Sequence, residues 1–205
     1  MFFKAACLAV ALTFTAVRVN AQEGLTPMEH AWIDAVNNVA EKNLKPDFTV
    51  KVAIYTEEAD SSVSVIAASY KDSTCTMHLS ARDNNQDTSV QAMASDPVIA
   101  RLTVVAHEYG HCVHRLLQKQ GASARKADQW PEAFADAYAI AWIGAYYPQY
   151  HSASIEFLLR LRSKDARGVY AMGVAVAKSA ESFVLNTERP IMDKALAILH
   201  RARKE

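Results

Sequence analysis

The sequence has 205 residues, of which 51% are hydrophobic and 21% are charged. These values are ordinary for a globular protein, and the length suits one compact domain with its own core. Basic and acidic residues number 22 each, so the formal charge is zero, and no basic run carries interleaved aromatic residues. The composition therefore gives no reason to expect nucleic acid as a partner.

The first twenty-one residues have the pattern of a secretory signal peptide. Lys4 gives a cationic start, residues 5–17 form an apolar run, and Val19-Asn20-Ala21 places small or modest side chains before a cleavage point. The run is too short to span a hydrocarbon core about 30 Å thick as a helix. We expect cleavage near Gln22, a periplasmic or extracellular location and no stable membrane insertion. An uncleaved N-terminal anchor is the alternative.

Residues 22–205 are expected to form a single domain. Its first part, to residue 121, carries a small sheet, and its second part, from residue 122, is helical. Thr26-Pro27-Met28-Glu29 is a capping box that predicts a helix to about Asn43. Three segments with alternating or β-branched apolar residues follow and predict strands over 48–54, 63–70 and 74–80. Because the connections between them are short, an antiparallel meander is expected.

Helical spacing of apolar residues dominates the rest of the chain. Ser95-Asp96-Pro97 gives an N-terminal cap for a long helix that ends near Gly121, and Pro131 begins another that ends before Pro148. Further helices are expected over the ranges 153–163, 169–183 and 190–203. One helix, a small and mainly antiparallel sheet and then only helices define an α+β fold.

The long helix contains the stretch VVAHEYGHCVHRLL, in which His107 and His111 lie four residues apart. On a helix their imidazoles lie on one face, one turn apart, and can reach the same ion. Neutral imidazole nitrogens suit Zn²⁺, and Glu108 projects beside them, where it can meet a water on the metal. Without a metal, these three polar side chains in an apolar helix would cost free energy to bury. Chance is the alternative interpretation.

His114 shares the face of the two histidines but is a poor third ligand. It lies seven residues after His107, which is about 10 Å along a helix. We expect His114 to lie at the surface or to contact a ligand indirectly. Position 117, where some zinc enzymes place a third histidine, is Leu117.

The better third ligand lies in WPEAFADAYAIAW, residues 130–142. Glu132 and Asp136 are four apart, and small alanines between them allow close helix packing. Glu132 would complete a site of two histidines and one glutamate for a single zinc ion, and Asp136 would accept the free ring N–H of His107. A solvated pair on an amphipathic helix is the alternative.

HEYGH followed by EAFAD resembles the gluzincin group of zinc metallopeptidases, the thermolysin-like clan, over roughly residues 98–142. The resemblance implies a minimal zincin-like fold in which two crossing helices follow a sheet. It implies that His107, His111 and Glu132 bind zinc and that Glu108 is the general base. The chain departs from the thermolysin pattern at Pro131, where that pattern has asparagine, and it is much shorter.

The resemblance also implies a peptide or protein substrate, paired with a sheet-edge strand beside the metal. We expect residues 74–80 to be that strand. A further donor usually holds the oxyanion of the reaction. The candidates in this chain are Tyr138, Tyr146, Tyr147, Tyr150, His151, Tyr170 and His200.

Two cysteines remain after signal cleavage, Cys75 and Cys112. In an oxidising compartment they can form a disulfide that ties the substrate strand to the metal-binding helix, and two buried free thiols are the alternative. Gly110 lies between the histidines, where it admits a close backbone or is there by chance.

The leading hypothesis is thus a secreted or periplasmic zinc metallopeptidase. An exported zinc protein that binds a protein or cell-wall partner without hydrolysis is the second hypothesis. An exported α+β binding protein without a metal is the third.

Overall fold

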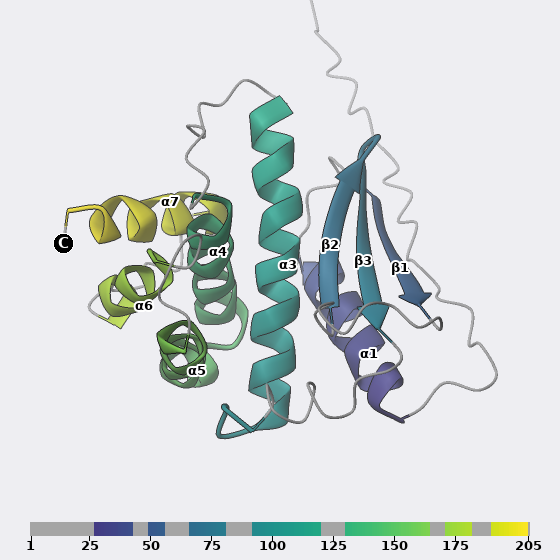
Figure 1. Ribbon diagram of the computed structural model, residues 1–205, viewed down its shortest axis with the longest axis horizontal. Helices are drawn as coiled ribbons and strands as arrows, with labels where there is room; N and C mark the ends of the chain where they lie inside the picture. Colours follow the sequence, from purple (N-terminus) through teal and green to yellow (C-terminus); the bar gives the residue numbers. More distant parts are fainter. Residues whose placement is uncertain are drawn as a thin grey trace, which may run out of the picture.

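The computed structural model describes residues 27–42, 49–55, 66–80, 92–119, 130–164, 171–181 and 190–204. The expected signal peptide, Thr26 of the capping box, Gly121 and Tyr170 lie outside the described residues. Within the described part the fold is α+β, as expected from the sequence (Figure 1).

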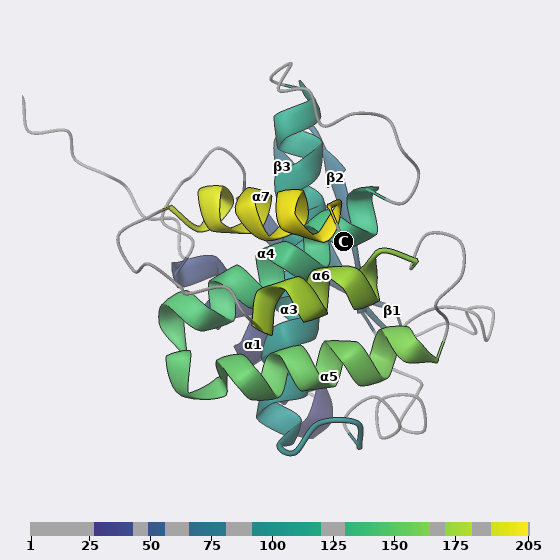
Figure 2. The same cartoon turned by 90° about the vertical axis from the view of Figure 1, so that its left-hand side faces the viewer.

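The described elements form three layers, with one long helix in the middle. Helix α3 (Pro97–Lys119) has the sheet and α1 (Pro27–Lys42) on one side and four C-terminal helices on the other (Figure 1). Figure 2 shows that α5, α6 and α7 lie one above another and cover α4. The four helices are α4 (Trp130–Tyr146), α5 (His151–Ser163), α6 (Gly173–Glu181) and α7 (Ile191–Ala202). A single 3₁₀ turn, η1 (Pro148–Tyr150), joins α4 to α5.

The sheet has the order β1-β3-β2, which corrects the expected antiparallel meander. Its strands are β1 (Thr49–Tyr55), β2 (Ile66–Lys71) and β3 (Thr74–Ser80). β2 and β3 are antiparallel, whereas β1 runs parallel to β3 along its other edge. The sheet is therefore mixed rather than mainly antiparallel, and β3 is its central strand rather than the expected edge strand.

The central strand β3 contributes two side chains to the hydrophobic core. Cys75 and Met77 are 0% exposed and belong to that core. The tight turn from β2 to β3 places Asp72 and Ser73 at φ values of 48° and 57°, the left-handed conformation that two-residue hairpin turns require.

Helix α3 begins where the sequence predicts. The Asp96 carboxylate accepts a hydrogen bond from the Val98 N–H at 2.8 Å, and the Asp96 carbonyl accepts the Ile99 N–H at 3.0 Å. Asp96 is thus the N-terminal cap of the helix. From Ile99 to His114 the helix is buried between the sheet and α4, which explains its many apolar residues.

Helix α4 is almost entirely buried, and its small residues let α3 approach closely. Residues 133 to 143 are all buried. A Cβ on Gly110 of α3 would lie 2.9 Å from the Cα of Ala135 on α4, so the two backbones touch here.

Among the described helices, none has both the length and the apolar character needed for a membrane crossing.

Candidate metal centre

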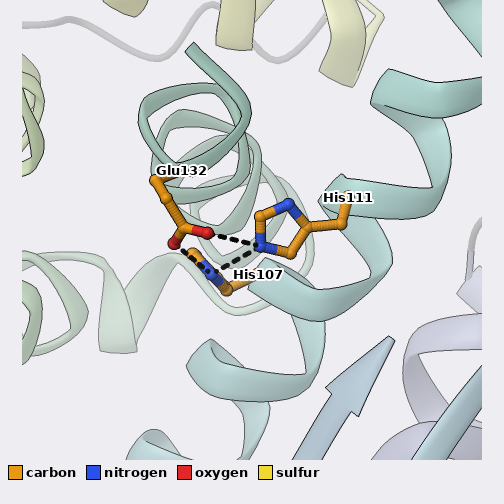
Figure 3. A group of neighbouring side chains, drawn as sticks. All are labelled: His107, His111 and Glu132. Carbon is orange, nitrogen blue, oxygen red and sulfur yellow. Dashed lines mark hydrogen bonds and ion pairs between the residues drawn. The ribbon is translucent and has the colours of Figure 1, made fainter. Parts of the chain in front are cut away.

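Three side chains from α3 and α4 meet where the two helices pack together (Figure 3). His107 Nε2 lies 3.1 Å from His111 Nε2 and 3.4 Å from Glu132 Oε2. His111 Nε2 lies 3.4 Å from the other carboxylate oxygen, Glu132 Oε1. The structure therefore brings together the three residues that the spacing singled out.

The spacing of these atoms fits one zinc ion. Four ligands at about 2.0–2.1 Å in a tetrahedron lie about 3.3 Å from one another. The separation of 3.1 Å between the two nitrogens is close to that value, and each nitrogen lies 3.4 Å from a different oxygen of the Glu132 carboxylate. One ligand atom from each residue lies within 4.8 Å of the other two. Two nitrogens and one carboxylate also form a donor set that zinc accepts while a fourth position stays open.

Asp136 lies one turn beyond Glu132 on α4 and contacts the other ring nitrogen of His107. His107 Nδ1 is 2.8 Å from Asp136 Oδ1, and Asp136 is 0% exposed. With the proton on Nδ1, the ring donates to Asp136 and its Nε2 is left to face the other donors. This is the arrangement that carboxylate–histidine–zinc sites use to fix the tautomer and the ring orientation.

Arg162 of α5 joins this group, although the sequence analysis did not include it. Its Nε and Nη2 donate to Asp136 Oδ2 and Oδ1 at 2.9 and 2.8 Å. Nη2 also lies 3.7 Å from Glu132 Oε2. The sequence does carry a signal for it, because Arg162 follows Ile155 and Leu158 on the buried face of α5.

The electrostatics of the metal-free donors follow from their burial and mutual contacts. Burial alone would lower the pKa of His107, but hydrogen bonds with Asp136 and Glu132 outweigh it and raise the pKa to about 9. Burial and the neighbouring His107 charge lower the pKa of His111 to about 3. Burial would raise the pKa of Asp136, but the hydrogen bond with His107 and the Arg162 charge lower it to about 2.

Glu108 lies next to His107 on α3, on the side that faces β2. The Ala68 backbone N–H donates to its carboxylate, and the charges of His107 and Glu132 act on it. Burial raises the pKa of Glu108 to about 7. At neutral pH this carboxyl group can therefore both accept and release a proton, which is what a general acid–base group requires.

His114 is not one of the three donors. It is 2% exposed, so of the two positions expected from the sequence the one at the surface is wrong. Its ring packs against Phe134 with centroids 5.3 Å apart. Burial and the nearby Arg115 lower the pKa of His114, so the ring is neutral.

The aromatic residues considered as oxyanion donors contact other parts of the protein. The hydroxyl of Tyr146 donates to the Lys42 carbonyl and that of Tyr147 to Asn38 Oδ1 at 2.7 Å, both on α1. Two of the remaining described candidates stack on other tyrosines, Tyr138 on Tyr109 and Tyr150 on Tyr147. The two histidines lie at the start of α5 (His151) and exposed on α7 (His200).

A disulfide joins Cys75 of β3 to Cys112 of α3. Cys112 follows His111 directly, so the bond ties the turn of α3 that carries the two histidines to the sheet. The strand it holds is the central strand, not an edge strand as expected.

Comparison of the chain with protein-family models, with curated proteins and with solved structures found no match.

Proposed function

We propose that the protein is a zinc-dependent metallopeptidase, a small member of the gluzincin group that its motifs resemble. The observation that carries the proposal is the convergence of two imidazole nitrogens, from His107 and His111, and the Glu132 carboxylate within the reach of one metal ion. Asp136 behind His107 and Glu108 beside it complete the set of roles that the motif implies.

His107, His111 and Glu132 would hold the metal, and zinc when bound supplies a Lewis acid that acidifies water and polarises a carbonyl group. The protein supplies the proton transfers. Glu108 takes the proton from the attacking water and then gives it to the amine leaving group as the peptide bond breaks.

The substrate strand of this proposal is β2 rather than β3. In the described residues no further strand pairs with the outer edge of β2, and this edge lies beside α3. The Ala68 N–H on β2 points to Glu108. An extended peptide that adds to this edge would therefore lie across the general base.

Export is part of the proposal. The N-terminal signal pattern favours it, and a disulfide between Cys75 and Cys112 suits an oxidising compartment.

The test is metal analysis and peptidase assay of the protein purified after secretion from the 205-residue chain. We expect one zinc per chain, cleavage of an unstructured quenched-fluorescence peptide, loss of cleavage with a chelator, and recovery with zinc. Glu108→Gln should keep the zinc and lose the cleavage. Glu181→Gln, an exposed glutamate on α6, is the matched control.

Each outcome has a separate meaning. Zinc without cleavage of any peptide would favour the exported zinc-binding protein instead. Absence of zinc would reject both of these functions. Cleavage that survives Glu108→Gln would reject the role of Glu108.

A further inference from the structure

The motif that suggested the site ends at Asp136, but the contacts around it continue into α5 and α6. Arg162 of α5 is 8% exposed. Its guanidinium faces Asp136 with two parallel hydrogen bonds of 2.9 and 2.8 Å. Such a fork fixes both oxygens of a carboxylate in one plane, which a single donor cannot do.

Gly173, the first residue of α6, lies directly against both members of the ion pair between Arg162 and Asp136. A Cβ at this position would lie 2.7 Å from Arg162 Cγ and 2.8 Å from Asp136 Oδ2. Real Cβ atoms do not come so close, so only glycine leaves room for the arginine and the carboxylate as they lie. Three helices, α4, α5 and α6, thus converge on one ion pair behind His107.

Resting on the zinc site proposed above, we propose that Arg162 is a positioning residue for the metal ligand His107, acting through Asp136, and that Gly173 leaves the space that this arginine needs. Asp136 Oδ1 accepts from both His107 Nδ1 and Arg162 Nη2. Arg162 Nη2 also lies 3.3 Å from His107 Nδ1 and 3.5 Å from its Nε2. A ring that donates from Nδ1 to Asp136 and keeps Nε2 for the metal has no acceptor left for the guanidinium. Arg162 therefore acts on the imidazole by fixing the position of the shared oxygen.

The charge of Arg162 is as important as its geometry. Asp136 is 0% exposed, and breaking a buried ion pair by removing one partner leaves the other charge uncompensated and is strongly destabilising. Loss of Arg162 would therefore disturb the oxygen that accepts from His107 Nδ1. Arg162 Nη2 also lies 3.7 Å from Glu132 Oε2, so the same cation attracts a metal ligand directly.

The experiment measures zinc affinity rather than activity. The 205-residue chain is produced by secretion, stripped of metal and titrated in competition with a fluorescent zinc chelator. Loss of a partner behind a zinc-bound histidine costs about 10–100-fold in affinity, and we expect that loss in Arg162→Met. Arg162→Lys keeps the charge but not the fork and should recover part of the affinity. Arg160→Met is the control, because Arg160 is exposed on the same helix and contacts Glu156 and the Met93 carbonyl.

A double-mutant cycle separates positioning through Asp136 from general loss of structure. If Arg162 acts through Asp136, Arg162→Met should weaken zinc binding little further in an Asp136→Asn background. The absorption bands of the cobalt-substituted protein should shift in the same way in both single variants. Fully additive losses in affinity, with different cobalt spectra, would overturn the proposal.

Gly173→Ala is an independent test of the same proposal. It should weaken zinc binding as Arg162→Met does, and it should weaken it less in an Arg162→Ala background, where the Cγ that the new methyl group meets is gone. If Arg162→Met fails to fold, the Arg162→Lys variant decides. In that case a zinc affinity equal to that of the unsubstituted protein overturns the positioning role.

An unsubstituted protein that binds no zinc overturns the proposed function as well, whereas tight binding unaffected by these variants overturns only the role of Arg162.

Discussion

Gly110 of α3 and Ala135 of α4 touch backbone to backbone: a Cβ on Gly110 would lie 2.9 Å from the Ala135 Cα and 3.1 Å from the Tyr138 Cβ. The contact lies next to His111, so it sets the distance from the two histidines to Glu132. In an exposed helix, alanine would be favoured over glycine by about 1 kcal/mol. At this contact the added methyl group must separate two packed helices.

We therefore expect Gly110→Ala to lower the free energy of unfolding by about 1–3 kcal/mol and to weaken zinc binding. Urea unfolding of the metal-free protein and chelator competition measure the two effects. Gln118→Ala, further along α3, is the control and should change stability by less than about 0.5 kcal/mol. Unchanged or higher stability of Gly110→Ala would show that the helices do not need this close approach.

Glu108 should lower the stability of the metal-free protein. Burial raises its pKa from 4.5 to about 7, so the folded state favours the protonated carboxyl group. As the pH rises through this window, the unfolded chain releases a proton that the folded chain keeps, and stability falls. Metal-free Glu108→Gln should match the unsubstituted protein at pH 4 and be more stable by about 3 kcal/mol at pH 8, since each unit of pKa difference corresponds to about 1.4 kcal/mol. Chemical unfolding at both pH values tests this, and a variant that is less stable at pH 8 would contradict it.

Zinc affinity should rise with pH. In the metal-free protein, hydrogen bonds with Asp136 and Glu132 outweigh burial and raise the pKa of His107 to about 9. A proton must leave this ring before its nitrogen can bind metal, whereas the pKa of His111 is lowered to about 3, so that ring is already neutral. The zinc dissociation constant should fall about tenfold per pH unit below pH 9. Calorimetry in buffers of different ionisation enthalpy should detect one released proton, and a dissociation constant independent of pH would refute this.

The disulfide between Cys75 and Cys112 should contribute strongly to stability. It closes a loop with a sequence separation of 37 residues, and bridges of this kind contribute about 2–4 kcal/mol, mainly by restricting the unfolded chain. Replacement of both cysteines by alanine should lower the free energy of unfolding by that amount. Thiol titration of the denatured, oxidised protein should find no free thiol after signal cleavage. Two reactive thiols would show that the bridge does not form.

The helices were predictable because their signals are local. The cap at Asp96, the prolines at 97 and 131 and the spacing of apolar residues depend only on nearby sequence, and the observed helix bounds agree with the predicted ones within four residues. The pairing of His107 with His111 is local as well, since one helical turn brings them together.

The order of the strands was not predictable in this way. Alternation in β1 and β3 indicates which side chains are buried, but both edges of β3 offer the same backbone groups to a neighbour. Nothing in the alternation distinguishes a parallel β1 beside β3 from an antiparallel β1 beside β2. The wrong neighbour also led to the wrong expectation that β3 is an edge strand.

Arg162 shows a different limit. Its helix was predicted, and an arginine in line with Ile155 and Leu158 already indicated a buried cation. Its partner could not be inferred, because Asp136 already had a partner in His107 and the packing of α5 on α4 is a long-range relation. Gly173 gave no sequence signal of any kind, since its role depends on the two side chains that it faces.

The distribution of the site along the chain has a consequence for truncation. The two histidines and both carboxylates lie between residues 107 and 136, but the groups that support them extend to Gly173 on α6. A shortened chain that stops after α4 would contain every ligand and still leave Asp136 without its cation. The shortest segment that contains the site and its supporting residues, 107 to 173, is therefore more than twice as long as the segment 107 to 136, which contains the sequence motif.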